Sequence, residues 1–198
     1  MAEGIAIFGL NGGGKSTLAH ALAQRMGYYE MDVEDYYFPE QKMSRMSALE
    51  NCSIPVTNHL GDLPFSCPRT KGEVEAALLE DSKAHPRFIL SGVTLHWTED
   101  ILSQIRVAFW VQTPLEERLK RIQQREIRRF GSRVLPGGDM YAQQADFRRT
   151  VEQRDSKAVE ETARSLSCPV IVLDGTLPLT DNLARMEEQL GRSPERAS

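Results

Sequence analysis

The chain contains few cysteines and no long apolar run, and each absence excludes a class of protein. Its three cysteines, Cys52, Cys67 and Cys168, are odd in number and form no C-x-x-C pair. We therefore expect free thiols rather than a disulfide framework or a zinc site. The longest apolar stretch, residues 88–95, is far too short to cross a bilayer, and no basic and then apolar leader opens the sequence. These absences predict a cytoplasmic protein with no membrane partner.

A strong excess of either charge is also missing. The formal net charge is −4 over 198 residues, which gives no bulk attraction to nucleic acid, so no nucleic-acid partner is expected. Hydrophobic residues make up 40% and charged residues 26%, as in ordinary folded domains. We predict a single domain over residues 1–191 and a frayed tail over 192–198. The sequence sets no oligomeric state and is compatible with a monomer.

Short apolar runs alternate with helix-like patterns along the chain. The runs predict five strands, at residues 4–8, 28–31, 87–93, 106–111 and 169–173. Helical spacing predicts helices at about residues 18–26, 70–81, 115–130, 138–166 and 180–190. Thr70 and Glu73 have the spacing of a capping box, and Thr180 is the expected N-cap of the last helix. The alternation predicts an α/β fold in which a parallel sheet carries helices on both faces and binds ligands beyond the carboxyl ends of its strands.

A glycine-rich loop follows the first predicted strand and precedes a predicted helix. Residues 9–16 match G-x-x-x-x-G-K-[ST] in full, the pattern of a loop whose backbone N–H groups surround phosphate oxygens. Lys15 would reach the β and γ phosphates, and the Ser16 hydroxyl would bind Mg²⁺. The predicted nucleotide-binding residues of this segment are Gly9, Asn11, Gly12, Gly13, Gly14, Lys15, Ser16 and Thr17. The loop predicts binding of a nucleoside triphosphate with magnesium.

Several segments decide between classes of protein that share this loop. The loop also resembles that of ABC-type ATPases, but no strand of four apolar residues ends in Asp-Glu, and neither GTPase motif, D-x-x-G or N-K-x-D, is present. Residues 32–34 are similar to the D-x-D element of shikimate and gluconate kinases. Residues 34–39 resemble the acid-acid-aromatic-aromatic element of uridine and nicotinamide riboside kinases. Residues 111–122 are similar to the entry to the arginine-rich lid of adenylate-type kinases, and residues 173–176, with Gly175, resemble their adenine-binding loop.

The chain thus resembles the small P-loop kinases, the group that contains adenylate, shikimate, gluconate and uridine kinases. The resemblance implies a three-layer P-loop NTPase fold of the adenylate-kinase type, with ATP and Mg²⁺ as the donor pair. It also implies that Asp32 holds magnesium through water and orients the acceptor hydroxyl, whereas the uridine-kinase-like pattern gives the role of base to Asp35. Residues 91–93 depart from both the adenylate and the shikimate kinase patterns, so no single named substrate is supported.

Arginines are concentrated in the helix predicted over residues 115–130. From Leu115 to Arg133 there are seven basic residues and three acidic ones. Phosphoryl transfer needs charge neutralisation around the moving group, and bidentate phosphate contact favours arginine over lysine. We predict a lid at about residues 125–139 and catalytic roles for Arg121, Arg125 and Arg129, with Arg118 and Arg128 on the same helix face as Arg121 and Arg125. The alternative interpretation is a solvated helix with ion pairs such as that of Glu117 with Arg121.

The acceptor side is predicted at the acids after the second strand and in an insert at about residues 37–86. Asp32 is the first candidate for binding magnesium or acting as the base, and Asp35 is the second. The alternative interpretation is that these acids form a surface turn without a catalytic role. If the strand continued, Asp32 and Glu34 would face one way and Asp35 the other. The aromatic residues Tyr36, Tyr37 and Phe38 either stack on a planar acceptor or pack in the core.

The sequence therefore favours ATP-Mg-dependent phosphoryl transfer to a small-molecule hydroxyl, nucleoside-like or sugar-like. A nucleoside monophosphate kinase is the alternative within the same class. Such an enzyme would need a second arginine cluster outside the lid, and the insert offers only Arg45 and Arg69. From another class, the alternative is a nucleotide-dependent switch ATPase that acts through a partner.

Overall fold

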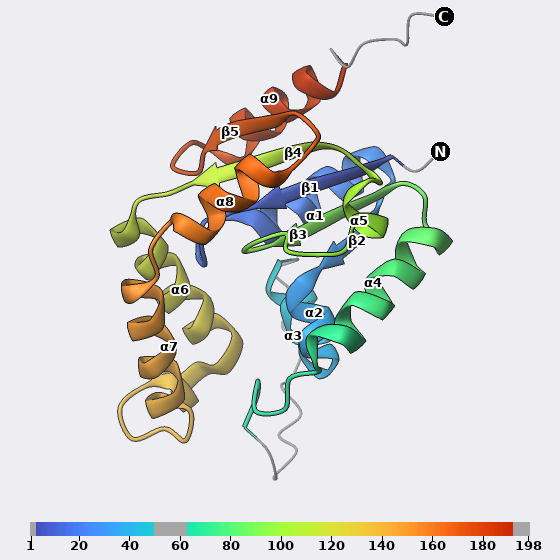
Figure 1. The fold of residues 1–198 in the computed structure, drawn as a ribbon. Helices are drawn as coiled ribbons and strands as arrows, with labels where there is room; N and C mark the ends of the chain where they lie inside the picture. The colour runs from blue at the N-terminus through green and yellow to red at the C-terminus, as the bar shows by residue number, and fades with distance from the viewer. Residues whose placement is uncertain (1–2, 50–62, 192–198) are drawn as a thin grey trace, which may run out of the picture.

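A parallel β-sheet forms the centre of the computed structural model, which describes residues 3–49 and 63–191 (Figure 1). Its strands lie in the order β2-β3-β1-β4-β5, and every neighbouring pair is parallel. The strands are β1 Gly4–Phe8, β2 Tyr29–Asp32, β3 Phe88–Gly92, β4 Ile105–Gln112 and β5 Val170–Asp174. All five predicted strands are confirmed, and their ends differ from the prediction by one residue at most.

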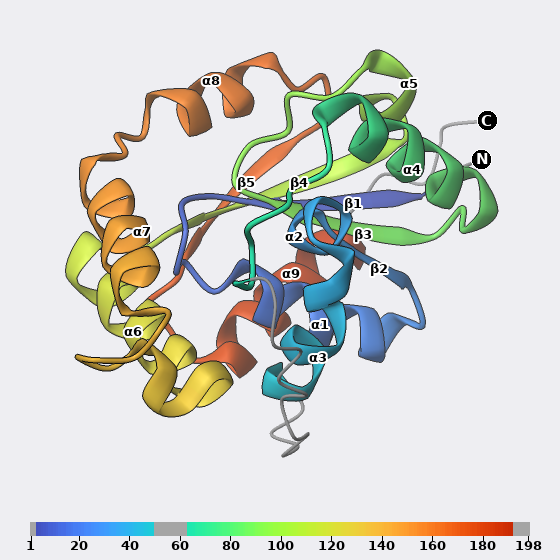
Figure 2. The ribbon, with the colours of Figure 1, turned by 90° about the horizontal axis from the view of Figure 1, so that it is seen from below.

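Two layers of helices cover the two faces of the sheet, as Figure 2 shows. On one face lie α1 Lys15–Met26 and α9 Leu179–Gly191, and on the other lie α4 Lys71–Ala84, α5 Glu99–Leu102 and α8 Lys157–Ser165. Successive residues of β1 alternate between the layers: Ile5 and Ile7 pack in the cluster with α1, and Ala6 and Phe8 pack in the other. Each of these four side chains is fully buried, as expected for a strand covered on both faces. The predicted three-layer fold is confirmed.

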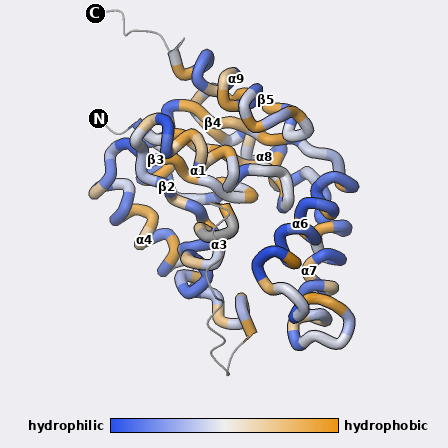
Figure 3. The backbone as a smooth tube through the Cα atoms, turned by 180° about the vertical axis from the view of Figure 1, so that it is seen from behind, coloured by the Kyte–Doolittle hydropathy of each residue, from blue (hydrophilic) through white to orange (hydrophobic). Residues whose placement is uncertain are grey.

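Two helices extend away from the sheet and lie side by side. They are α6 Leu115–Phe130 and α7 Tyr141–Gln153, joined through the short 3-10 helix η2 Gly131–Val134. Figure 3 shows that α6 is hydrophilic along much of its length, in contrast to the apolar sheet. A small core of Phe130, Val134 and Met140 holds the tip of this pair together.

Three details of the helix predictions were wrong. Helical spacing places Leu115, Leu119 and Ile122 on one apolar face of α6; Ile122 is buried, but Leu115 is 39% exposed, and Arg118 and Arg129 are buried on that helix as well. The single helix predicted over residues 138–166 is divided into α7 and α8, because Arg154 has extended backbone angles. The last helix begins at Leu179, and the carbonyl of Pro178, rather than the side chain of Thr180, accepts the first amide hydrogen bonds.

The segment after β2 turns directly into a helix. The helix α2 Val33–Tyr37 begins because Asp32 acts as its N-cap and accepts a hydrogen bond from the backbone N–H of Glu34. The strand does not continue past Asp32, so the condition under which Asp32 and Glu34 would face one way and Asp35 the other is not met. The elements that follow are η1 Pro39–Gln41 and α3 Lys42–Leu49. The capping box of Thr70 and Glu73 at the start of α4 is confirmed.

Parts of the sequence predictions fall on residues 50–62 and 192–198, which lie outside the described residues. They are the middle of the predicted insert, which includes Cys52, and the predicted frayed tail. Cys67 and Cys168 are free, as expected. None of the helices in residues 3–49 and 63–191 combines the length and the apolar character that crossing a bilayer requires.

Candidate functional site

The glycine-rich loop lies at the carboxyl end of β1 and ends at the first turn of α1. Gly14 takes a left-handed conformation with φ of 100° just before the helix, and a Cβ atom on Gly9 would lie 2.4 Å from the carbonyl oxygen of Val111. Both positions therefore require glycine. Thr113 donates a hydrogen bond of 3.1 Å to the carbonyl of Gly13, and Arg118 reaches the carbonyl of Asn11 at 3.4 Å. The segment that leads into α6 and the first turn of that helix thus hold the backbone of the loop in place.

Lys15 is buried at the start of α1. Its Nζ donates a hydrogen bond of 3.0 Å to the carbonyl of Leu10, within the same loop. Burial lowers the pKa of Lys15 to about 8, and the negative charge of Asp32 acts in the opposite direction. The protonated amine is therefore poorly stabilised in the free protein, and an anionic group placed in the loop would stabilise it.

Two cavities meet at this loop. The larger, of about 720 Å³, lies among the loop, the carboxyl ends of β2 and β3, and helices α6 and α7; the smaller, of about 250 Å³, lies among α1, α3 and α6. Six residues line both: Gly12, Lys15, Ser16, Glu34, Arg125 and Arg129. Of the other predicted loop residues, Asn11 lines the larger cavity, and Gly14 and Thr17 line the smaller one. Gly9 and Gly13 line neither of these two cavities.

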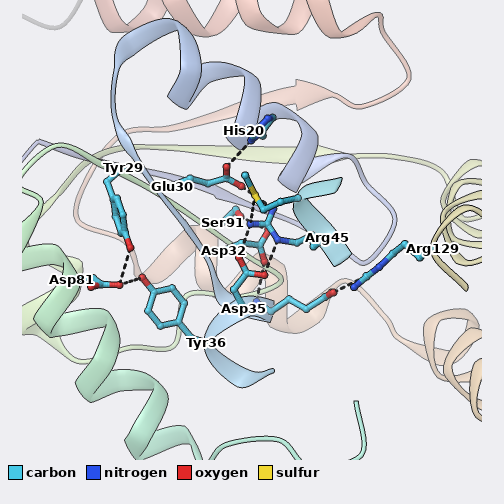
Figure 4. Close-up of polar contacts among 12 residues, drawn as sticks. His20, Tyr29, Glu30, Asp32, Asp35, Tyr36, Arg45, Asp81, Ser91 and Arg129 are labelled. Carbon is cyan, nitrogen blue, oxygen red and sulfur yellow. Dashed lines mark hydrogen bonds and ion pairs between the residues drawn. The ribbon is translucent and has the colours of Figure 1, made fainter. Parts of the chain in front are cut away.

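Asp32 lies at the end of β2 and lines the larger cavity. Its side chain is nearly buried, and one carboxylate oxygen accepts the N–H of Glu34 while the other accepts the hydroxyl of Ser91 at 2.9 Å (Figure 4). Ser16 lines the same cavity. A carboxylate and a hydroxyl are ligands that suit Mg²⁺, which usually keeps several waters and takes one or two carboxylates beside phosphate oxygens. The residues present therefore fit a magnesium ion, although no group of three acidic, histidine or cysteine side chains in the described segments is placed to hold a metal alone.

Asp35, the second predicted base, is not brought to either cavity. It is buried in α2, and Arg45 of α3 binds both of its oxygens, with Nε 2.8 Å from Oδ1. Figure 4 shows the carboxylates of Asp32 and Asp35 turned toward the guanidinium group of Arg45, which also pairs with Glu30. Burial raises the pKa of Asp35, although the hydrogen bonds from Arg45 act against that rise. This ion pair links α2 to α3, which is a structural role for Asp35.

The arginines of α6 differ in whether they line the cavities. Arg125 and Arg129 line both cavities, and Arg121 and Arg128 line the smaller one. The predicted ion pair of Arg121 with Glu117 is present, and Arg121 also donates to the carbonyl of Gly175, which brings those two predicted residues together. Arg118 instead turns to the loop backbone.

Arg129 is the most buried of the arginines at the cavities. It pairs with Glu34 at 3.1 Å and lies over the rings of Phe65 and Phe130. Burial lowers its pKa, and the charge of Glu34 opposes that change. Within the described residues, Nη2 of Arg129 and Nε of Arg125 are buried without a hydrogen-bond partner. These buried N–H groups without a partner are donors that an anionic ligand could accept from.

Several functional residues were missed at the sequence level. Arg154, just after α7, donates a hydrogen bond of 2.8 Å to the side chain of Asn11 and lines the larger cavity. Ser91 was given no role from the sequence, although its position near the carboxyl end of β3 was a usable signal. Tyr36 bonds to Asp81 away from both cavities, whereas Tyr37 and Phe38 line the larger one.

Gly175 supports the glycine-rich loop through close packing. A Cβ atom there would lie 1.9 Å from Oγ1 of Thr113, whose hydroxyl holds the carbonyl of Gly13. We expect Gly175→Ala to lower the free energy of unfolding by about 1–3 kcal/mol, because Thr113 must move. The matched control is Gly72→Ala in α4, where a Cβ meets nothing within 4 Å and stability should be unchanged or slightly higher. Urea unfolding of both variants measures the difference, and equal stability would contradict the assignment.

A family model described as an AAA domain matches residues 5–133. This stretch covers more than half of the chain and contains the glycine-rich loop, Asp32 and the arginines of α6. The chain belongs to this AAA domain family. Within the stretch matched by the AAA domain, Lys15, Asp32, Arg125 and Arg129 line the larger cavity, whereas Arg154 lies beyond that stretch.

Known proteins similar to this AAA-domain chain cover nearly all of it. The uncharacterized protein YqaC of Bacillus subtilis (strain 168) is 26% identical over 198 residues, which is 96% of this chain and 98% of YqaC. A shikimate kinase from Acinetobacter baumannii, solved in complex with shikimate, has a TM-score of 0.52 at 18% identity and covers 99% of this chain and 96% of its own. An unliganded sugar kinase from Janibacter sp. HTCC2649 has a TM-score of 0.50 at 15% identity and covers 100% and 99%. The fold is that of the small P-loop kinases.

Proposed function

We propose that this protein is a kinase that transfers the γ-phosphoryl group of ATP to a hydroxyl group of a small molecule. The observation that carries the proposal is the larger cavity, where Lys15, Asp32 and Arg125 surround one space beside the glycine-rich loop. The cavity of about 720 Å³ has room for a second substrate, since small-molecule sites commonly span about 300–1,000 Å³. We assign the lid to the tip of the α6–α7 pair, whose helices line the cavity.

The proposed reaction follows from where these groups lie. Asp32 accepts the proton of the acceptor hydroxyl, and the hydroxyl oxygen attacks the γ-phosphorus while the bond to the β–γ bridging oxygen breaks and ADP leaves. Lys15, Arg125 and Arg129 neutralise the charge on the transferred group. Mg²⁺, when held by Ser16 and Asp32, would add to that neutralisation. Ser91 and the N–H of Glu34 orient the Asp32 carboxylate.

A hydroxyl acceptor is better supported than a nucleoside monophosphate. The monophosphate alternative requires cations outside the lid, and the two candidates were Arg45 and Arg69. Arg45 is buried and already paired with Glu30 and Asp35, and Arg69 lines neither cavity. Arg45 lines the smaller cavity but not the larger one, so a phosphate on an acceptor held in the larger cavity would meet neither of these arginines.

Acceptor-dependent ADP release tests the proposed function. The purified protein is given ATP-Mg with nucleosides, nucleoside monophosphates, sugars or sugar acids, and Lys15→Ala serves as the blank. We expect one acceptor class to raise ADP release at least tenfold above the rate without acceptor. A rate that no acceptor changes, although ATP binds, would favour the switch ATPase that acts through a partner.

The pKa of Lys15 predicts how nucleotide affinity depends on pH. The free protein loses the lysine proton as the pH rises through about 8, and a bound triphosphate should hold that proton to a much higher pH. The protein therefore has its full affinity for ATP-Mg well below pH 8 and loses affinity as the pH rises through 8. ATP-Mg should bind about tenfold more weakly at pH 9 than at pH 7. Isothermal titration calorimetry measures this change. Lys15→Arg stays charged and should show no such dependence, and a flat profile for the unaltered protein would contradict the account.

A further inference from the structure

Aromatic rings are gathered at the end of the larger cavity farthest from the glycine-rich loop. Phe130 lies twelve residues beyond Arg118, which contacts the loop, and this separation is about 18 Å along a helix. Phe65 makes edge contacts with Phe38 at 5.2 Å and with Phe130 at 6.1 Å. The aromatic residues that line the cavity are Tyr37, Phe38, Phe65, Trp97, Phe130 and Phe147. Of these, Phe38, Phe65 and Phe130 contact one another and make this end suited to a flat, apolar ring.

One buried carboxylate lies among these rings. Glu126 of α6 is 2% exposed and lines the cavity; Arg148 of α7 holds its Oε2 at 2.5 Å. Its Oε1 is buried and has no hydrogen-bond partner among the described residues. Burial raises the pKa of Glu126, and the charge of Arg148 opposes that change. A buried carboxylate oxygen without a donor is costly, so a ligand that supplies an N–H group would stabilise the site.

From this geometry we infer that the larger cavity binds a nucleoside, whose flat base lies between the aromatic side chains and donates an N–H of its exocyclic amino group to Oε1 of Glu126. As the acceptor of the proposed kinase, on which this inference rests, the nucleoside would present a sugar hydroxyl toward Asp32. A free sugar has hydroxyls on all sides and would place several of them against the rings without partners. A sugar acid would bring a carboxylate into a cavity whose aromatic end already carries the buried carboxylate of Glu126, and like charges repel.

Nucleosides that differ at the base edge test the role of Glu126. Adenosine and cytidine carry an amino group, whereas inosine and uridine carry a carbonyl oxygen at the corresponding position. In Glu126→Gln the side-chain oxygen can remain on Arg148 and the amide NH₂ replaces Oε1, so a donor takes the place of an acceptor. We expect the KM for adenosine or cytidine to rise at least tenfold, the KM for inosine or uridine to stay the same or fall, and the KM for ATP to stay within twofold.

Two further variants complete this test. Glu152→Gln makes the same change on the exposed face of α7, outside both cavities, and should alter no kinetic constant. Phe147→Leu keeps an apolar side chain but removes a ring, and should raise the nucleoside KM several-fold. Unchanged KM values for all four nucleosides in folded Glu126→Gln would overturn the role of Glu126.

Binding without ATP separates a failure of this inference from a failure of the proposed function. Quenching of tryptophan fluorescence, to which Trp97 in the cavity and Trp110 in β4 contribute, is followed with adenosine and cytidine, with ribose as the matched probe that lacks the base. Nucleoside binding that Glu126→Gln weakens supports the inference even if no acceptor is phosphorylated, and in that case only the kinase proposal fails. Phosphorylation of gluconate or shikimate, with no binding of any nucleoside, overturns the inference and leaves the kinase proposal standing.

Discussion

Lys15→Ala is expected to reduce phosphoryl transfer to any acceptor by about a thousandfold, because it removes the buried cation that lies where the two cavities meet. Among the residues that the structure describes, no other lysine lines both cavities. Steady-state ADP release with the acceptor that the panel identifies measures the effect. Lys83→Ala on the exposed side of α4 is the matched control and should retain full activity.

Stability measurements should separate this loss from unfolding. The pKa of Lys15 in the folded protein, about 8, lies below the ordinary lysine value. The folded state therefore binds the lysine proton more weakly than the unfolded chain does, and the charged amine costs stability at neutral pH. Lys15→Ala should consequently keep or raise the melting temperature at pH 7. A folded Lys15→Ala protein with normal turnover would contradict the assigned role.

Asp32→Asn is expected to lower kcat by two to three orders of magnitude while the affinity for ATP changes only a few-fold. The amide oxygen can still accept the hydrogen bond from the N–H of Glu34, so the start of α2 should be preserved. The amide cannot take a proton from the acceptor hydroxyl. Single-turnover transfer at saturating acceptor measures the chemical step, and Asp100→Asn, an exposed change in α5, is the control.

Asp35→Asn gives the opposite pattern in this account. Its carboxylate is bound by Arg45 in a buried ion pair, and removal of one partner of such a pair costs about 3–5 kcal/mol of stability. The effect should appear in unfolding rather than in kcat. A folded and inactive Asp35→Asn enzyme, beside an active Asp32→Asn enzyme, would place the base at Asp35 and contradict the proposed mechanism.

The parts of the site that lie close together in the sequence could be predicted from it. The glycine-rich loop is one continuous segment, and its position after a buried strand fixes where it lies in a parallel sheet. Asp32 follows the same rule because it ends β2. The arginines of α6 could be placed on a helix by their spacing, but the direction of Arg118 could not, since it depends on the carbonyls of Thr113 and Asn11.

Contacts between distant segments could not be predicted in this way. Arg154 reaches Asn11 across 143 residues, and Ser91 reaches Asp32 across 59. The start of α2 was missed although its signal was present: an N-cap aspartate followed by two acids in the first turn. That helix carries Asp35 toward Arg45, a contact that could not be anticipated once the N-cap was missed.

The central claim, transfer of the γ-phosphoryl group to a second small molecule in the larger cavity, is tested most directly by following the phosphoryl group itself. The protein is incubated with Mg²⁺, ATP labelled with ¹⁸O on the γ-phosphoryl group and the nucleoside panel, and the products are separated by mass spectrometry. The account predicts a nucleoside that has gained one labelled phosphoryl group, absent with Lys15→Ala. Label found only in inorganic phosphate, at a rate independent of the nucleosides and of any sugar or sugar acid added in their place, would contradict it.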